Sequence, residues 1–380
     1  MTVFHTQSLG SKARVPIALG FLIAACLVLF SKWAAATQAD EVTAGLSHPW
    51  AVAFIEEGRM LVSEQRPGQI RVVEANGKLS SPLKGLPKVD SVRAHRGLLD
   101  LVVDRNYKTN RLVYFCYVEA DKNGGSTTMA RARLSNDRSE LEDVGVIFRQ
   151  YPQDYSDHHF GCRIVQALDG HLFLTLGDRE KHKEDAQILD NHHGKLVRVT
   201  TDGQVPAGNP FAGKAGALPQ IWSYGHRNIQ AAALSPSGAL WAAEHGPLGG
   251  DELNLVLPGK NYGWPLISYG KEYDGRPIGN GLTHAQGMEQ PVKHWSTIAP
   301  SGMAFATTDR YGAGWRGSIL IASLRGSLLR LEMKADRVIR EHTVWISQGE
   351  RVRDVREAPD GTIYFLIDHP TNGRLMRLLP

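Results

Sequence analysis

The stretch "EHGPLGGDELNLVLPGKNYGWP", residues 244–265, gathers glycines, prolines and acids around two short apolar segments. Gly246 and Pro247 bring no reactive side chain, but two closely spaced carbonyl oxygens on tightly turned backbone suit a hard cation such as Ca²⁺. Asp251 and Glu252 place two carboxylates a few residues further on. A rigid turn with solvated acids has the same composition, so the residues alone leave a cation site and a plain turn open.

A second stretch, "DHHFGCRI" at residues 157–164, offers a base. His159 stands ahead of a loop glycine and four residues before Arg163. Because an imidazole titrates near pH 7, this side chain can take a proton from a substrate. A loop histidine is more often structural or merely exposed, and both interpretations stay open at this point.

Two further segments carry cations. Arg227 and Asn228 in "YGHRNIQ" offer a guanidinium fork and an amide, and strand alternation in "RVRDV" puts Arg351 and Arg353 on one face. Two arginines on one face and a third from another segment suggest a site for a multiply charged anion. Each arginine taken singly is more simply a surface salt bridge.

Several common catalytic signatures are absent from the sequence. There is no GxGxxG after a strand, no P-loop, no HExxH, no GxSxG and no paired Cys-x-x-Cys. The 15 histidines leave a zinc site open on numbers alone, although the adjacent His192 and His193, expected on opposite faces of a strand, would not share an ion. The net charge of +4, without long charged runs, weakly favours anionic ligands and gives no argument for nucleic acid.

The elements that would position these residues recur along the chain. A turn followed by an apolar strand occurs six times, beginning at Glu57, Thr109, Asp169, Ser237, Arg316 and Asp360. A glycine followed by a strand with an arginine begins at Gly68, Gly194, Gly326 and Gly373. The pattern predicts an all-β fold, a six-bladed β-propeller of four-stranded antiparallel sheets, in which loops converge at one end of the central channel. A pair of β-sandwiches is the weaker alternative, because it needs no recurring signature at this spacing.

The N-terminal segment differs from the rest. Residues 15–30 form an uncharged apolar stretch after Lys12 and Arg14, and small residues allow cleavage after Ala36 or Ala39. We therefore expect residues 1–39 to be a signal peptide or an N-terminal membrane anchor, with a lipoprotein signal as a third possibility. Residues 40–380 are expected to be the exported, periplasmic propeller domain. The fold then retains only Cys116 and Cys162, which excludes a disulfide scaffold.

Read in order, "HFGCRI", "GHRN", "EHGPLGGDELN", "GKNYGWP", "APSGM" and "RVRDV" resemble one family. The family is that of the pyrroloquinoline-quinone-dependent aldose sugar dehydrogenases, the group of soluble glucose dehydrogenase and sorbosone dehydrogenase. The resemblance extends from Leu46 to the C-terminus, and the glycine-rich loop with "GKNYGWP" is its most specific part. Six blades are also what that family has.

The resemblance implies a role for each motif. The carbonyls of Gly246 and Pro247 would bind a Ca²⁺ that polarises the quinone C5 carbonyl, while Glu252 and Tyr262 match positions of further calcium ligation. His159 would take the proton from the C1 hydroxyl of an aldose while hydride passes to quinone C5. Arg227 would stabilise the oxyanion that develops on that carbonyl. The residues implied to hold the cofactor are His95, Arg227, Asn228, Thr297, Arg325, Arg351 and Arg353.

Three residues depart from the family pattern. His95 replaces the usual glutamine, Arg325 replaces a lysine, and His158 stands where the glucose-oxidising branch has an aspartate. These changes bear on cofactor affinity and sugar preference. The expected activity is oxidation of aldoses to lactones, with electrons passed to a quinone or a redox protein. The alternatives are a non-catalytic binding propeller and a calcium-dependent lactonase on the same fold.

Overall fold

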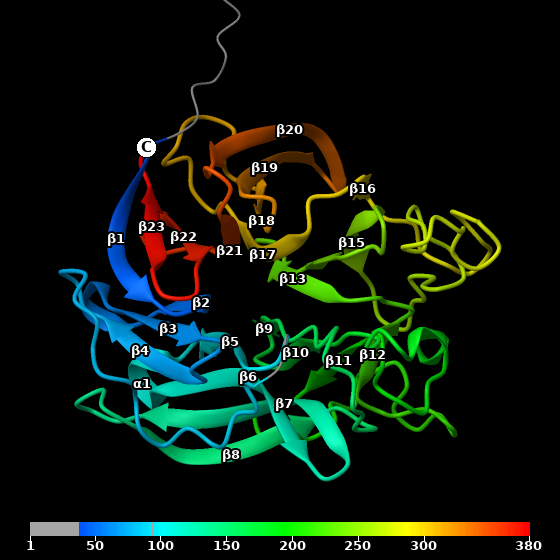
Figure 1. The fold of residues 1–380 in the computed structure, drawn as a ribbon, viewed down its shortest axis with the longest axis horizontal. Coiled ribbons are helices and arrows are strands. Elements are labelled where there is room, and N and C mark those ends of the chain that lie inside the picture. The colour runs from blue at the N-terminus through cyan, green and yellow to red at the C-terminus, as the bar shows by residue number, and fades with distance from the viewer. Residues whose placement is uncertain (1–37, 93–94) are drawn as a thin grey trace, which may run out of the picture. The chain divides into compact units, whose positions relative to one another are not determined.

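The computed structural model describes residues 38–92 and 95–380, and this part of the chain is mostly β-strand and connecting loop (Figure 1). The strands form six antiparallel sheets arranged radially around a common axis. Within the sheets, strands that are consecutive in the chain pair with each other. The predicted six-bladed β-propeller is therefore confirmed.

The strands of each sheet are as follows. The first sheet contains β2 (Pro49–Phe54), β3 (Met60–Glu64) and β4 (Gln69–Val73). The second contains β5 (Leu98–Val103), β6 (Leu112–Asp121), β7 (Gly124–Leu134) and β8 (Leu141–Arg149). The third contains β9 (Ile164–Gln166), β10 (Leu172–Thr175), β11 (Lys195–Val199) and β12 (Ile221–Tyr224).

The remaining three sheets complete the ring. The fourth contains β13 (Ile229–Leu234), β14 (Leu240–Glu244), β15 (Asp251–Val256) and β16 (Lys293–Trp295). The fifth contains β17 (Pro300–Phe305), β18 (Ile319–Ser323), β19 (Ser327–Lys334) and β20 (Arg337–Ile346). The sixth contains β21 (Arg351–Glu357), β22 (Ile363–Asp368), β23 (Gly373–Leu378) and β1 (Ala39–Leu46).

Within the part of the chain that the structure describes, helical structure is confined to short turns. The described helices are α1 (Tyr107–Asn110) and the 3₁₀ turns η1 (Glu56–Gly58) and η2 (Lys183–Gln187). None of the helices within residues 38–92 and 95–380 has the length and apolar character needed to cross a membrane. The expected leader lies almost wholly outside the described residues, so its function stays a prediction.

The sequence repeats correspond to fixed positions in the sheets. The six turn-and-strand repeats lead into the second strand of each sheet, and the four glycine-and-arginine repeats lead into third strands. The first sheet has three regular strands rather than the four predicted. An irregular segment takes the place of the fourth strand beside β4. In this segment, Leu79 makes an isolated bridge to Val73, and the N–H groups of Ser80 and Leu83 donate to backbone oxygens of β4. Pro82 has no N–H to donate, which explains why this edge stays irregular.

The two ends of the described chain close the ring. β1 pairs antiparallel with β23, from Ala39 opposite Leu378 to Leu46 opposite Gly373. The innermost strands β2, β5, β9, β13, β17 and β21 each contact the innermost strands of both neighbouring sheets. Cleavage after Ala36 would leave β1 whole, whereas cleavage after Ala39 would remove its first residue.

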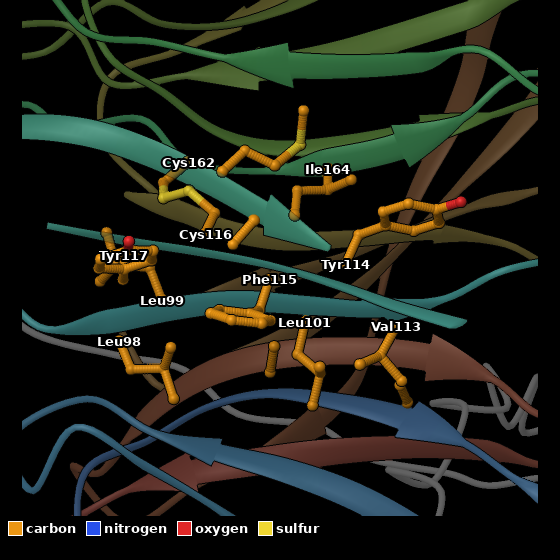
Figure 2. Packing of buried hydrophobic residues seen from close by; sticks show 14 of the residues in the cluster. Leu98, Leu99, Leu101, Val113, Tyr114, Phe115, Cys116, Tyr117, Cys162 and Ile164 are labelled. Atoms are coloured by element: carbon orange, nitrogen blue, oxygen red, sulfur yellow. A yellow bond between two sulfur atoms is a disulfide. The ribbon is translucent and has the colours of Figure 1, made fainter. Parts of the chain in front are cut away.

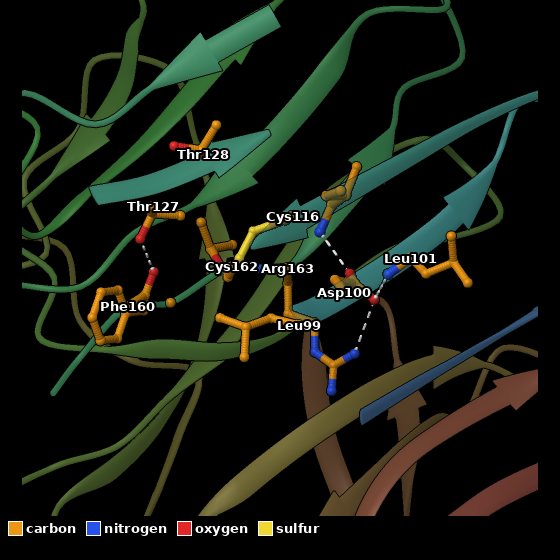
Figure 3. Close-up of a disulfide and its surroundings, with 12 residues drawn as sticks. Leu99, Asp100, Leu101, Cys116, Thr127, Thr128, Phe160, Cys162 and Arg163 are labelled. Atoms are coloured by element: carbon orange, nitrogen blue, oxygen red, sulfur yellow. Dashed lines mark hydrogen bonds and ion pairs between the residues drawn. A yellow bond between two sulfur atoms is a disulfide. The ribbon is translucent and has the colours of Figure 1, made fainter. Parts of the chain in front are cut away.

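A buried arginine joins the blades at the axis. Arg163 is 1% exposed, and its guanidinium contacts a residue from each of the other five sheets. These contacts are Asp100 at 3.2 Å, Asp354 at 3.1 Å, the carbonyl oxygen of Gln230 at 2.8 Å, the carbonyl oxygen of Ser301, and the ring of Trp50 at 3.9 Å. Figure 3 shows the guanidinium reaching Asp100. Arg163 therefore has a structural function, although it lies in the same motif as His159.

Apolar side chains fill the space between neighbouring blades (Figure 2). The largest cluster includes Leu98, Leu101, Phe115 and Ile164, all at most 1% exposed. Within it, Cys116 of β6 forms a disulfide with Cys162, with Cα atoms 6.0 Å apart. This single crosslink joins the second blade to the segment that enters the third. The absence of a multi-disulfide scaffold agrees with the cysteine count.

Candidate functional site

Most of the predicted site residues lie in loops at one end of the propeller's central channel, which we call its mouth. In an up-and-down sheet, the loop entering the first strand and the loop from the second to the third strand open at the same end. A pocket of about 870 Å³ lies among such loops. Ten of the predicted residues line it: His95, His159, Arg227, Asn228, Gly246, Pro247, Thr297, Arg325, Arg351 and Arg353.

His159 is fixed by a buried carboxylate. Its Nδ1 lies 2.6 Å from Oδ1 of Asp178, whose Oδ2 accepts a hydrogen bond from Nε1 of Trp264 at 2.8 Å. His159 is 7% exposed and Asp178 is 1% exposed. Burial lowers the pKa of His159 and outweighs the hydrogen bond that the imidazole donates to Asp178, which acts in the opposite direction. The imidazole is therefore neutral at pH 7, and the orienting carboxylate directs its Nε2 away from Asp178.

The pKa of Asp178 is displaced as well. Burial acts to raise it, but the hydrogen bond from His159 and the charge of Arg227 act in the opposite direction, and the pKa falls below its ordinary value. The carboxylate stays ionised and holds one tautomer of the imidazole. Sequence reasoning missed Asp178 and Trp264, because nothing in the printed sequence indicates that residues 86 positions apart share a hydrogen bond.

The backbone that carries His159 is held on several sides (Figure 3). His159 and Cys162 have positive φ angles of 51° and 77°, which non-glycine residues seldom adopt. Between them, the carbonyl oxygen of Phe160 accepts from Oγ1 of Thr127 at 2.8 Å. The Gly161 N–H donates to Oδ1 of Asn228 at 3.1 Å, and a Cβ at Gly161 would lie 2.6 Å from Leu176. The disulfide then anchors the end of this segment.

Arg227 contacts both the start of the glycine-rich stretch and the segment that follows that stretch in the chain. Its Nη1 donates to the carbonyl oxygens of Gly246 at 2.8 Å and His245 at 3.2 Å, and its Nη2 lies 3.4 Å from the hydroxyl of Tyr273. Its backbone N–H donates to Oε2 of Glu244 at 2.6 Å. The guanidinium is thus oriented by the same loop whose carbonyls were expected to bind a cation. A carbonyl oxygen has two lone pairs, so Gly246 can accept this bond and still ligate an ion.

The arginines from the fifth and sixth blades supply positive charge at the pocket wall. Arg353 pairs with Asp368 at 2.7 Å, while its Nε has no hydrogen-bond partner. Among the ion pairs of the described residues, none involves Arg325 or Arg351. Arg66 and Lys271, which sequence reasoning did not select, add two further cations to the lining. This arrangement favours a ligand with several negative charges.

The four predicted metal ligands are divided between two cavities. Gly246 and Pro247 line the large pocket, whereas Gly246, Glu252 and Tyr262 line a small neighbouring cavity of about 10 Å³. The Tyr262 hydroxyl donates to the Leu255 carbonyl at 2.6 Å and accepts from the Leu257 N–H at 2.8 Å. Its phenol is therefore engaged elsewhere, and only its backbone remains available to an ion. A Cβ at Gly246 would lie 2.0 Å from the Gly249 oxygen, so this turn requires glycine.

The small cavity brings two buried carboxylates together. Glu252 of β15 lies opposite Glu244 of β14, and Nδ2 of Asn254 donates to both side chains, at 3.3 and 3.1 Å. Burial, followed by the charge of Glu244, raises the pKa of Glu252. A bound cation would reduce the repulsion between two such buried carboxylates, which fits the calcium ligation expected for Glu252. Glu244 was not selected from the sequence, although it begins the glycine-rich stretch.

Comparison with known proteins adds independent information. The family model described as Glucose / Sorbosone dehydrogenase matches residues 46–377. The chain belongs to the glucose/sorbosone dehydrogenase family. It is 39% identical over 367 residues to aldose sugar dehydrogenase YliI of Escherichia coli, covering 95% of this chain and 98% of that protein.

Solved structures agree with this membership. The apo-form of soluble aldose sugar dehydrogenase from E. coli has a TM-score of 0.85 and 38% identity, covering 90% of this chain and 99% of that one. The PQQ-bound aldose sugar dehydrogenase of Streptomyces coelicolor has a TM-score of 0.72 and 27% identity, covering 90% and 97% respectively. One structural neighbour of the chain has thus been solved with PQQ bound.

Proposed function

We propose that the protein is an exported quinoprotein that oxidises aldose sugars at C1 to lactones, using pyrroloquinoline quinone and Ca²⁺. The observation that carries this proposal is the convergence of a carboxylate-oriented histidine, a set of arginines and the Gly246–Pro247 turn on one pocket. Family membership and the PQQ-bound relative support the same conclusion.

The lining residues suit the quinone, which carries three carboxylates. Arg325, Arg351 and Arg353 would bind these carboxylates, because guanidinium groups form paired hydrogen bonds with them. His95, Asn228 and Thr297 would complete the hold with uncharged donors and acceptors. When bound, the quinone supplies the two-electron acceptor for the hydride that leaves the sugar C1.

His159 supplies the base that this oxidation requires. Loss of hydride from C1 leaves the attached hydroxyl strongly acidic, and neutral His159 can accept that proton on Nε2. Asp178 stabilises the imidazolium that results, as its hydrogen bond to Nδ1 already indicates. Arg227 adds positive charge beside the same pocket, where an oxyanion would be stabilised.

Calcium would bind at the Gly246–Pro247 turn, where carbonyl oxygens are the available ligands. Glu252, Glu244 and the backbone of Tyr262 would hold a further ion in the adjacent small cavity, where two acids already face each other. Both sites offer the oxygen ligands that Ca²⁺ prefers. The disulfide is consistent with an oxidising compartment and so supports export to the periplasm, with a quinone or redox protein as electron acceptor.

Reconstitution tests this proposal with two readouts. The chelator-treated protein should bind one equivalent of the quinone in the presence of Ca²⁺, and the loaded protein should then reduce a dye only when an aldose is added. The double variant R351Q/R353Q should bind the quinone at least about tenfold more weakly. Lack of quinone binding would favour a binding propeller, and hydrolysis of lactones without quinone would favour the calcium-dependent lactonase.

A further inference from the structure

A second cluster of ligating side chains lies in the loops of the third blade. His182 immediately precedes η2, Asp185 lies within it, and His193 stands in the turn that leads into β11. Among the described residues that line the mouth pocket, none belongs to this cluster. The proposed sugar oxidation gives these three residues no role.

The two imidazoles lie close to one carboxylate oxygen of Asp185. Oδ2 of Asp185 lies 2.8 Å from Nδ1 of His193 and 3.6 Å from Nδ1 of His182. Ligand atoms around a tetrahedral ion at the usual Zn–N and Zn–O distances stand about 3.3 Å apart. The two observed separations lie on either side of that value, so small side-chain shifts would let one ion contact all three.

A second carboxylate lies beyond the other ring nitrogen of His193, which has no hydrogen-bond partner among the described residues. The ring is fully buried, and Nε2 lies 3.5 Å from Oδ2 of Asp154, which is also paired with Arg179 at 2.9 Å. A neutral imidazole has one proton to share between these two carboxylates. Nδ1 shares a hydrogen bond with Asp185 at 2.8 Å, and an ion bound between these two atoms would take the place of that proton. The proton would then stand on Nε2, which has no hydrogen-bond partner in the described part of the chain and faces Asp154. Metal-binding histidines commonly direct their second nitrogen at a carboxylate in this way.

The other two ligands are accessible to an ion from solvent. The side chains of His182 and Asp185 are 38% and 32% exposed. The ring of His182 stacks on that of His193 with centroids 4.7 Å apart, and its exposure leaves room for the ring to turn its nitrogen toward an ion. Lys195 does not compete for the carboxylate, because its Nζ donates to the backbone oxygens of Asp185 and His193.

His192 takes no part in this cluster. The His192–His193 pair lies in a turn rather than in the strand expected from the sequence. Nδ1 of His192 accepts from the Tyr151 N–H at 3.0 Å, and its ring packs against Phe148. The two rings therefore have different neighbours.

We propose that His182, Asp185 and His193 form a binding site for a divalent transition-metal ion of the Zn²⁺ class, with water completing the coordination. Two imidazoles and one carboxylate suit Zn²⁺, whereas Ca²⁺ takes six to eight oxygen ligands. The ion would fix η2 to the turn before β11. This site is independent of the quinone and of the calcium sites at the mouth.

Titration with Zn²⁺ alone tests the site. The full chain, made without a histidine tag, is treated with a chelator, supplied with excess Ca²⁺, and titrated with Zn²⁺ against a chromophoric competitor. We expect one equivalent to bind with micromolar or tighter affinity. H182Q and D185N should each weaken this binding at least about tenfold, because each removes one of three protein ligands.

The matched control is H342Q. The side chain of His342 is 28% exposed, and its Nε2 lies 3.4 Å from Glu332. Among the described residues, His342 belongs to no group of three possible metal ligands. This variant should bind Zn²⁺ as the unmodified protein does. If the unmodified protein binds no Zn²⁺ at micromolar concentration, or if H182Q binds it equally well, the proposal is wrong. H182Q changes a side chain that is partly exposed, so folding should be retained and is checked by the melting temperature.

Discussion

At the scale of single residues, the site depends on a few side chains whose partners come from distant parts of the sequence. His159 and the Arg227 loop were selected from local motifs, and the structure places them around one pocket. Asp178, Trp264 and Glu244 were not selected, because their importance arises from contacts across the fold. A carboxylate such as Asp178 in "LGDRE" is typical of any turn, and only its 2.6 Å distance to His159 distinguishes it.

The lowered pKa of His159 predicts the pH dependence of the proposed reaction. The base acts only when neutral, so kcat/KM should rise with pH and reach half its maximum below pH 6.5, the ordinary histidine value. Steady-state rates between pH 4.5 and 9 would measure this limb. An acid limb centred above pH 7 would contradict the assignment.

Replacement of Asp178 provides a control for that profile. The carboxylate favours the protonated imidazole, so D178N should move the acid limb to still lower pH. It should also lower kcat, because the imidazole loses its orienting partner. E180Q is the matched change, since Glu180 pairs at 3.1 Å with the exposed His158 and its charge acts on the pKa of His159 less than Asp178 does. E180Q should leave the direction of the pH dependence and most of kcat unchanged.

Among the elements, the segment between β8 and β9 carries His159, the proposed base, and sets its position. Its positive φ angles at His159 and Cys162 could not be inferred from residue types, because neither residue is a glycine. The turn-and-strand repeats, in contrast, predicted the second strand of all six sheets, since each combines a turn with a continuous apolar run. The irregular edge of the first sheet was missed because the fourth strand was inferred from the repeat pattern of the whole chain, and Pro82 was not considered.

The disulfide predicts a measurable contribution to stability. It closes a loop with a sequence separation of 46 residues, and the chain-entropy model assigns about 4 kcal/mol to a loop of this size. The double variant C116S/C162S should therefore lose several kcal/mol of unfolding free energy in urea, and its kcat should fall because His159 is three residues from Cys162. Dithiothreitol added to the folded, unmodified protein at low temperature should change its stability and its kcat little, because both cysteines are buried and the reductant cannot reach the disulfide. Equal stability of the variant and the unmodified protein would contradict this account.

In the whole propeller, two sets of contacts hold the ring of blades together. The strand β1 pairs with β23 in the sixth blade, and Arg163 contacts the other five blades near the axis. Sequence repeats predicted the number of blades, but not that β1 would complete the sixth sheet with β23. The function of Arg163 was also hidden, since its motif suggested chemistry near a base. Only the assembled ring brings Asp100, Asp354 and Trp50 to one guanidinium.

Arg163 should therefore be required for stability. R163M leaves Asp100 and Asp354 buried with less positive charge, and loss of one member of a buried ion-pair network typically costs about 3–5 kcal/mol. R133M is the matched control, because Arg133 is 45% exposed and pairs with Glu142 on the surface. Surface pairs contribute at most about 1 kcal/mol. Urea unfolding would compare the two variants, and equal losses would show that the axial contacts do not support the ring.

His159 is expected to remove a proton from an aldose in the same pocket that is proposed to bind the quinone. A single-turnover measurement tests it most directly: protein loaded with quinone and Ca²⁺ is mixed with excess glucose or another aldose that it oxidises, and reduction of the cofactor is followed by absorbance. We predict rapid reduction in the unmodified protein, and in H159A unchanged quinone binding with a reduction rate at least about 100-fold lower. Reduction at the same rate in H159A, with the quinone bound equally well, would contradict the account.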